Sequence, residues 1–246
     1  MATIWIPLPD HDFDVTEVAV PWKLFVEAGH RVVFTTERAG TRGAADPRLI
    51  DGVIFGQLGA ADEPKRFYFE MLDTDAYRSS RAWGDVDVNE FDALMLPGGH
   101  APGMKQYLGS ETLQQQVAAF WAAGKPVGAI CHGTIVLARS RDASGKSVMH
   151  ASRTTCLPKY MEGLAYGLTF WKLGRYYRTY PAYVEDEVRS VLDDAGRQFE
   201  RGPVNLGARG TREDDSPTFV VEDGRYVSAR WPGDAYAFAR SMLKRL

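Results

Sequence analysis

The chain has 246 residues, of which 45% are hydrophobic and 12% aromatic, so it can bury a substantial core and is not a disordered chain. Its 29 Lys and Arg residues nearly balance 32 Asp and Glu residues, and no basic face indicates nucleic acid as a partner. No apolar run approaches the roughly 18 residues of a membrane span. The first residues, MATIWIPLPD, lack a secretory pattern, and two cysteines make no disulfide framework, so we expect a cytoplasmic protein.

The first part of the chain predicts a strand, a helix and a second strand. Residues 2–8 (ATIWIPL) predict the first strand, residues 12–30 a loop and a helix, and residues 31–37 (RVVFTTE) the second strand. Thr16 is a candidate N-cap, while Pro21 predicts either a kink or a helix that begins near it. This order favours a right-handed βαβ unit in a parallel sheet.

Residues 40–90 form a long, less regular connection, which we expect to be a lid-like insertion beside a binding site. Within it, residues 63–78 predict a helix. Buried strands follow at 91–99, which ends in a Gly pair, and at 126–130, with a helix over 110–125 between them.

The last part of the chain predicts a helix over 184–196, a hairpin around Asp223 within 218–229, and a closing helix over 234–246 capped by Asp234. No internal repeat and no linker is visible. We therefore expect one α/β domain over residues 1–246.

Cys131 lies between the predicted strand 126–130 and a predicted helix, TIVLARS, at 134–140. Sites in parallel sheets form at the carboxyl ends of strands, and a sharp strand-to-helix turn lifts a side chain into that position. Such a turn needs little bulk two residues to either side, where this chain has Ala129 and Gly133. The amino end of the helix should lower the pKa of the thiol and offer N–H groups to an oxyanion.

The ordinary interpretation of one such cysteine is a buried core residue. A second Gly-rich strand end, MLPGGHAPGM at 95–104, predicts another tight turn with free N–H groups. Two such turns at the ends of strands in one sheet favour a functional site.

The segments FDALMLPGGHAPGM and KPVGAICHGTIVLARS, with an acid after the first strand in DFDVTEVAVPW, resemble the ThiJ/PfpI superfamily. The segment 40–90 is similar to that of the larger glyoxalase and chaperone branch. The resemblance implies a three-layer sandwich with a mostly parallel central sheet, flavodoxin-like or class I glutamine amidotransferase-like, that carries a nucleophile elbow.

The resemblance also implies roles for individual residues. Cys131 would be the nucleophile, and Glu17 the protonated acid that binds the thiolate and moves protons. His132 would act as a base or an orienting group, and its N–H would form an oxyanion pocket with that of Gly99. The implied oxyanion and substrate pocket comprises Gly98, Gly99, His100 and Gly133.

Relatives of the larger branch carry a third acid shortly after a proline in the segment behind the elbow. Here Lys159 follows Pro158, and Glu162 is the nearest acid, so a full hydrolytic triad is in doubt. A thiol can attack an aldehyde without a triad, whereas amide cleavage must also protonate a poor leaving group. Cys156 is interpreted as a core thiol.

His11 and His150 are not spaced with other ligands as in a metal site, and no Gly fingerprint for a nucleotide follows the first strand. We therefore expect no metal and no cofactor. The expected partner is a small-molecule substrate, with neither nucleic acid nor membrane. The resemblance implies a homodimer.

The sharpest hypothesis is a glutathione-independent glyoxalase that converts methylglyoxal to lactate, or a related deglycase, and its substrate comes from the resemblance alone. One alternative is an intracellular amidase or peptidase that cleaves C–N bonds with the same nucleophile. Another is a redox-responsive chaperone or sensor without turnover, since a reactive thiol is also oxidisable. Isonitrile hydration is a further possibility that nothing in the sequence selects.

Overall fold

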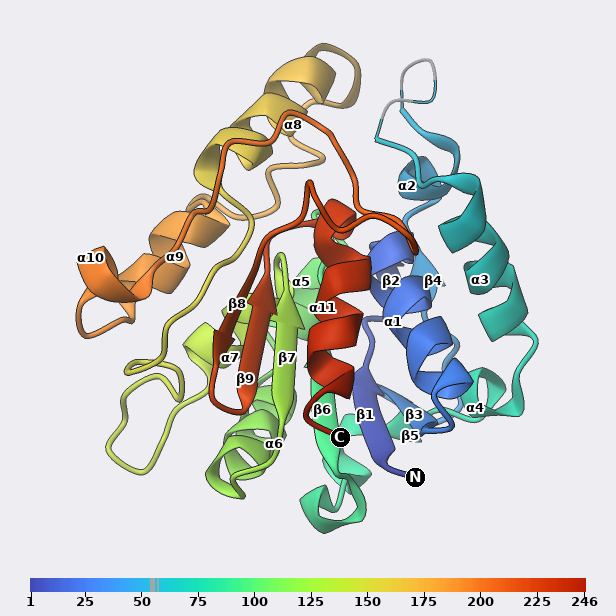
Figure 1. Cartoon of the computed structure of the whole chain (residues 1–246), viewed down its shortest axis with the longest axis vertical. Coiled ribbons are helices and arrows are strands. Elements are labelled where there is room, and N and C mark those ends of the chain that lie inside the picture. Colours follow the sequence, from blue (N-terminus) through green and yellow to red (C-terminus); the bar gives the residue numbers. More distant parts are fainter. Residues whose placement is uncertain (54–55, 57) are drawn as a thin grey trace.

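The computed structural model describes residues 1–53, 56 and 58–246. A twisted sheet crosses the molecule with helices on both faces (Figure 1). Within the described residues its strands are, in spatial order, β5 (Arg81–Ala82), β3 (Arg31–Thr36), β1 (Thr3–Pro7), β6 (Ala93–Leu96), β7 (Val127–Ile130), β9 (Tyr226–Ala229) and β8 (Val220–Asp223). All neighbours are parallel except β8 and β9, which form the predicted hairpin.

The helices complete the predicted three-layer α/β sandwich, so the expected fold class is confirmed. One layer contains α1 (Val15–Glu27), α3 (Asp62–Leu72) and α11 (Ala235–Leu243). The opposite layer contains α5 (Met104–Leu108), α6 (Glu111–Ala122), α7 (Gly133–Arg139) and α9 (Val184–Ser190). The small elements are α4 (Asp75–Arg78), α10 (Ala195–Gln198) and a pair of parallel strands, β2 (His11–Phe13) and β4 (Ala44–Ala45).

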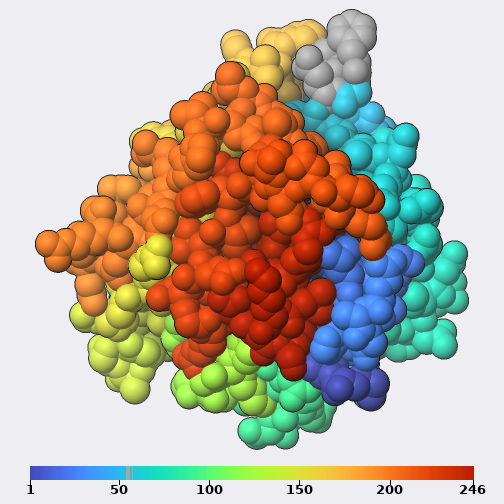
Figure 2. All heavy atoms as spheres, in the orientation of Figure 1, coloured from blue at the N-terminus to red at the C-terminus, as the bar shows by residue number. Residues whose placement is uncertain are grey.

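Two helices lie beyond the carboxyl ends of the parallel strands, opposite the end where both chain termini lie (Figure 1). They are α2 (Pro47–Asp51) and α8 (Lys159–Leu173). The segment 201–219, orange in Figure 2, crosses the same end of the molecule above α11. No helix in the described part of the chain has the length and apolar character needed to cross a membrane.

The N-cap of α1 differs from the prediction. Asp14, not Thr16, caps the helix, because its Oδ1 accepts the N–H groups of Thr16 at 2.8 Å and Glu17 at 3.1 Å. The helix begins at Val15 and contains Pro21 in its interior, so a start near Pro21 was wrong. This cap fixes Glu17 in the first turn of the helix.

Four other elements depart from the expectations. The predicted helix 63–78 is divided into α3 and α4, and the predicted helix 184–196 ends at Ser190, with the separate α10 after it. Helix α8 was not predicted at all. Asp234 stands before α11 as expected, but its carboxylate binds the buried Arg230 guanidinium, at 2.9 Å from Nε, and the N–H of Phe219 instead of capping the helix.

Candidate active site

Cys131 lies on a strained turn between β7 and α7. Its φ of 56° is in the left-handed region, which a side chain other than glycine rarely adopts. The turn is held on both sides, because the Cys131 N–H donates to Ala229 O at 3.0 Å and Thr134 Oγ1 donates to Cys131 O at 2.7 Å. Strain that persists under such constraint is typical of functional positions, and the geometry is that of the predicted elbow.

Gly133 is required by the close packing of this turn. A Cβ at this position would lie 2.2 Å from the carbonyl oxygen of Leu96, the last residue of β6. The first turn of α7 therefore rests directly on the neighbouring strand. This close contact explains why glycine stands two positions after Cys131, and it brings the Pro-Gly-Gly end of β6 beside Cys131.

Replacing Gly133 by alanine is expected to lower the free energy of unfolding by at least ~2 kcal/mol, because backbone atoms would have to move apart. Gly167→Ala, within α8, is the matched control: its added Cβ meets nothing within 4 Å. That control should be neutral or stabilising by about 0.5–1 kcal/mol, as for glycine in a helix interior. Urea unfolding of both variants measures the difference, and equal midpoints would contradict the packing argument.

Glu17 is fully buried and lies against the elbow. Its Oε2 accepts the N–H of Gly98 at 2.9 Å, and its Oε1 has no hydrogen-bond partner among the described residues. A Cβ on Gly98 would lie 2.8 Å from Oε2 of Glu17 and 3.0 Å from Cβ of Cys131. Glycine at position 98 thus permits the carboxyl group, the thiol and the backbone to meet.

The thiol and the carboxyl group influence each other's pKa in opposite directions: Glu17 raises the pKa of Cys131, whereas Cys131 lowers that of Glu17. Burial raises the pKa of Glu17 well above its ordinary value, and the nearby Asp14 carboxyl raises it further. Burial also raises the pKa of Cys131, as does Glu17, while the N–H of His132 lowers it. The prediction that the helix end lowers the pKa of the thiol overall was wrong, because burial outweighs it. Two adjacent groups that cannot both ionise share one proton over a wide pH range.

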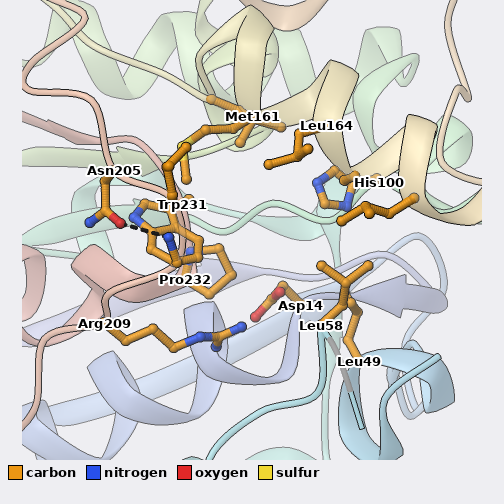
Figure 3. A pocket seen from close by; sticks show the side chains of 15 residues that line it. Asp14, Leu49, Leu58, His100, Met161, Leu164, Asn205, Arg209, Trp231 and Pro232 are labelled. Atoms are coloured by element: carbon orange, nitrogen blue, oxygen red, sulfur yellow. Dashed lines mark hydrogen bonds between the residues drawn. The ribbon is translucent and has the colours of Figure 1, made fainter. Parts of the chain in front are cut away.

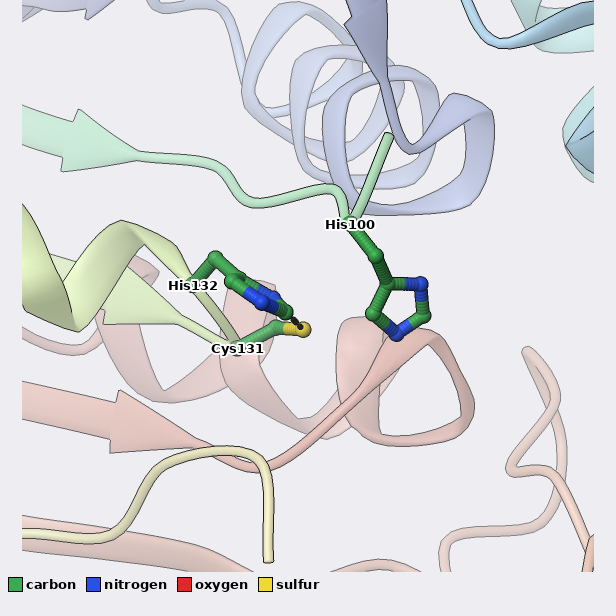
Figure 4. Close-up of side chains that lie close together, drawn as sticks. All are labelled: His100, Cys131 and His132. Atoms are coloured by element: carbon green, nitrogen blue, oxygen red, sulfur yellow. Dashed lines mark hydrogen bonds between the residues drawn. The ribbon is translucent and has the colours of Figure 1, made fainter. Parts of the chain in front are cut away.

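Two imidazole rings lie next to the thiol (Figure 4). His132 Nδ1 is 3.4 Å from Cys131 Sγ, and the ring of His100 meets that of His132 edge to face at a centroid distance of 5.0 Å. Burial lowers the pKa of His132 well below its ordinary value and that of His100 to about 4. Both rings are therefore neutral at pH 7.

No carboxylate among the described residues hydrogen-bonds to His132. Glu162 is buried, but its Oε1 accepts from Arg178 Nη1 at 3.1 Å and its Oε2 from the N–H of Val184 at 3.0 Å. Glu162 therefore stabilises the connection between α8 and α9, and it does not complete a triad with Cys131 and His132. Cys156 is buried in the core, as predicted.

Three side chains each offer one atom that could bind a metal ion, and they belong to His100, Cys131 and His132. These ligand atoms lie within 4.8 Å of one another. One sulfur and two imidazole nitrogens are ligand types that suit Zn²⁺. The expectation of no metal rested on His11 and His150. His150 instead binds Asp193, with 2.7 Å between its Nδ1 and a carboxylate oxygen.

A cavity lies beside this cluster, and its lining includes His100, which was predicted as a pocket residue. Sequence reasoning missed most of the other lining residues, which include Asp14, residues of α8 and residues of the segment 205–209. Asp14 could have been found as a capping residue three positions before Glu17. The cavity residues of α8 could not have been found in this way, because nothing in the sequence indicates that α8 packs near the strand ends.

The fold and the elbow define an α/β protein with a cysteine on a strained turn between a strand and a helix. The family described as ThiJ/PfpI family-like matches residues 8–203, most of the chain, and the protein belongs to this family. A solved structure, glyoxalase III from Candida albicans, is 18% identical with a TM-score of 0.70, covering 100% of this chain and 97% of that one.

Three curated proteins are similar in sequence. An uncharacterized protein of Schizosaccharomyces pombe is 33% identical over 168 residues, which are 65% of this chain and 61% of that protein. A deglycase of Pyrococcus abyssi is 25% identical over 95% of this chain and 93% of its own length. A glutathione-independent glyoxalase of Schizosaccharomyces pombe is 23% identical over 93% of this chain and 84% of its own length.

Proposed function

We propose that this protein is a cofactor-free enzyme in which Cys131 attacks the aldehyde carbon of a small dicarbonyl compound, with methylglyoxal to lactate as the simplest reaction. The observation that carries the proposal is the buried Glu17 carboxyl beside the thiol on a strained elbow. Relatives named deglycase and glyoxalase support this class of chemistry.

In the first step, the proton shared by the pair resides on Glu17 and the thiolate attacks C1 of methylglyoxal. An S–C bond forms, and Glu17 gives its proton to the aldehyde oxygen, which yields a hemithioacetal. The carboxylate of Glu17 then removes the proton from C1, and the electrons move onto the oxygen at C2. The N–H groups of Gly99 and His132 would stabilise that enediolate, and the N–H of Gly99 donates to no acceptor among the described residues.

In the second step, Glu17 returns its proton to C2, and the neutral His132 carries the hydroxyl proton from one oxygen to the other. The product is a thioester in which C1 is oxidised and C2 is reduced, so no external oxidant is needed. Water then attacks C1, the C–S bond breaks, lactate leaves, and the pair recovers its proton.

The two alternatives fit less well. Amide cleavage needs an oriented imidazolium to protonate a poor leaving group, and no acid orients His132 within the described residues. A redox sensor needs an exposed thiol, whereas only 1% of Cys131 is exposed. The exposed Phe170 and Trp171 on α8 would suit a chaperone surface or a subunit contact.

The test is lactate formation from methylglyoxal by the pure protein in the absence of glutathione, with heat-denatured protein as the background. We expect turnover that saturates with substrate. A rate equal to the background at every methylglyoxal concentration would reject the proposal for this substrate.

A further inference from the structure

An apolar cavity adjoins the Cys131 site at the carboxyl end of the sheet (Figure 3). Its walls are mainly aliphatic: Met161, Leu164 and Leu168 come from α8, and Leu49 comes from α2 on the opposite side. Trp231, which precedes α11, closes a third side. The walls thus come from chain segments that meet only in the folded protein.

The cavity lies directly beside the candidate active site, with His100 between the two. His100 lines it, and a nitrogen of the His100 ring lies within 4.8 Å of Cys131 Sγ. Asp14 also lines it, and the same carboxylate caps the helix turn that carries Glu17. A substrate with its aldehyde at the thiol would therefore extend its other end between α8 and α2.

The charged groups and the amide that line the cavity already have partners, whereas His100 Nδ1 and Trp231 Nε1 have none among the described residues. Arg209 and Asp14 point toward one another in Figure 3, and the charge of Arg209 lowers the pKa of Asp14 against the effect of burial. The Asn205 side chain accepts the N–H groups of Gly207 and Ala208 and donates to carbonyl oxygens, which leaves it structural. What the cavity offers a ligand is its apolar wall.

The volume sets the size of the ligand. The cavity measures about 150 Å³, close to the size of apolar cavities that accept a benzene molecule. The methyl group of methylglyoxal would occupy only a small part of this space. A phenyl ring or a chain of four to six carbons would fill it and remove more apolar surface from water.

Given the function proposed above, on which this inference rests, we propose that the cavity is a subsite for a large apolar substituent of the substrate. The preferred substrates are α-oxoaldehydes that carry a ring or a medium alkyl chain, and methylglyoxal is a poor member of the class. His100 separates the cavity from the thiol, and its buried Nδ1 has no hydrogen-bond partner among the described residues. The His100 ring can therefore rotate to admit the aldehyde without losing a hydrogen bond at Nδ1.

The first experiment compares kcat/KM for methylglyoxal and for 2-oxoheptanal, which has a pentyl group in place of the methyl. The wild type should prefer 2-oxoheptanal by on the order of 10- to 100-fold. Ala165→Trp fills the cavity from α8 and should abolish the preference by lowering kcat/KM for 2-oxoheptanal. Tyr166→Trp, at the adjacent position outside the cavity, is the matched control and should behave as the wild type.

A second readout does not depend on turnover. Acetophenone has the ring but no aldehyde, and it should slow the alkylation of Cys131 by iodoacetamide in the wild type and in Tyr166→Trp, but not in Ala165→Trp. Leu164→Asn replaces a half-exposed wall residue and should weaken protection even if Ala165→Trp fails to fold. If no oxoaldehyde is turned over but protection follows this pattern, the proposed function fails and the subsite stands.

Equal kcat/KM for the two aldehydes, together with no protection by acetophenone, would overturn the subsite. A change of oligomeric state in Ala165→Trp, with the wild-type substrate preference retained, would also overturn it. In that case this face of α8 would be a contact between subunits.

Discussion

The Cys131→Ala variant is expected to lose lactate formation almost completely, with kcat/KM reduced by at least ~1000-fold. The thiol forms the only covalent bond to substrate in the proposed reaction. Thermal unfolding should change little, since the turn stays fixed by the Ala229 and Thr134 contacts.

Cys156→Ala is the matched control, because it removes the other cysteine from a fully buried position outside the elbow. It should keep activity within a few fold of the wild type. Wild-type activity in Cys131→Ala would show that the thiol is not the catalyst for this substrate.

Glu17→Gln is expected to reduce kcat by about 100- to 10,000-fold, the range for loss of a general acid–base group. Glutamine has the same shape and can still accept the Gly98 N–H, but it cannot pass a proton between C1 and C2. Alkylation of Cys131 should continue in this variant, since the nucleophile is intact. Steady-state rates and peptide mapping after iodoacetamide treatment measure the two effects separately.

Glu162→Gln is the control for a buried acid. It should keep activity but lower the melting temperature, because Arg178 loses its charged partner. Equal losses of activity in the two variants would mean that Glu17 acts through the fold and not through its proton.

The pH dependence of the wild type follows from the shared proton. Burial raises the pKa of both Glu17 and Cys131, so the pair loses its first proton at a higher pH than an isolated glutamate does. The acid limb of kcat/KM should therefore lie above the ordinary titration range of glutamate, with activity increasing as pH rises through it. An acid limb at the ordinary glutamate pKa would contradict the coupling.

The sheet and the elbow could be predicted because short-range patterns determine them. One buried strand ends at Pro-Gly-Gly, residues 97–99, and another ends at Cys131. The turn after each of these strands needs small residues, and the chain has glycines there. Ser110 caps α6 through a side-chain oxygen that accepts the N–H of Leu113, so that helix was also predictable. Parallel strands then bring the two turns to the same edge of the sheet.

The cavity and the role of Glu162 could not be predicted, because long-range contacts decide them. Helix α8 contains glycines at 163 and 167 and apolar residues on several faces, a pattern that does not indicate a helix or which side of one is buried. Glu162 is the nearest acid after Pro158 in the segment behind the elbow, yet Arg178 Nη1 donates to one of its carboxylate oxygens. The cap of α1 was missed because aspartate and threonine are both good N-caps, so composition alone did not separate Asp14 from Thr16.

The most direct test of the account is to quench the protein with acid during turnover of methylglyoxal and map the covalent adduct by mass spectrometry. We expect a thioester on the peptide that contains Cys131, present during turnover, lost when substrate is exhausted, and missing from Cys131→Ala. Full-rate lactate formation with Cys131 unmodified at every time point would contradict covalent catalysis at the elbow.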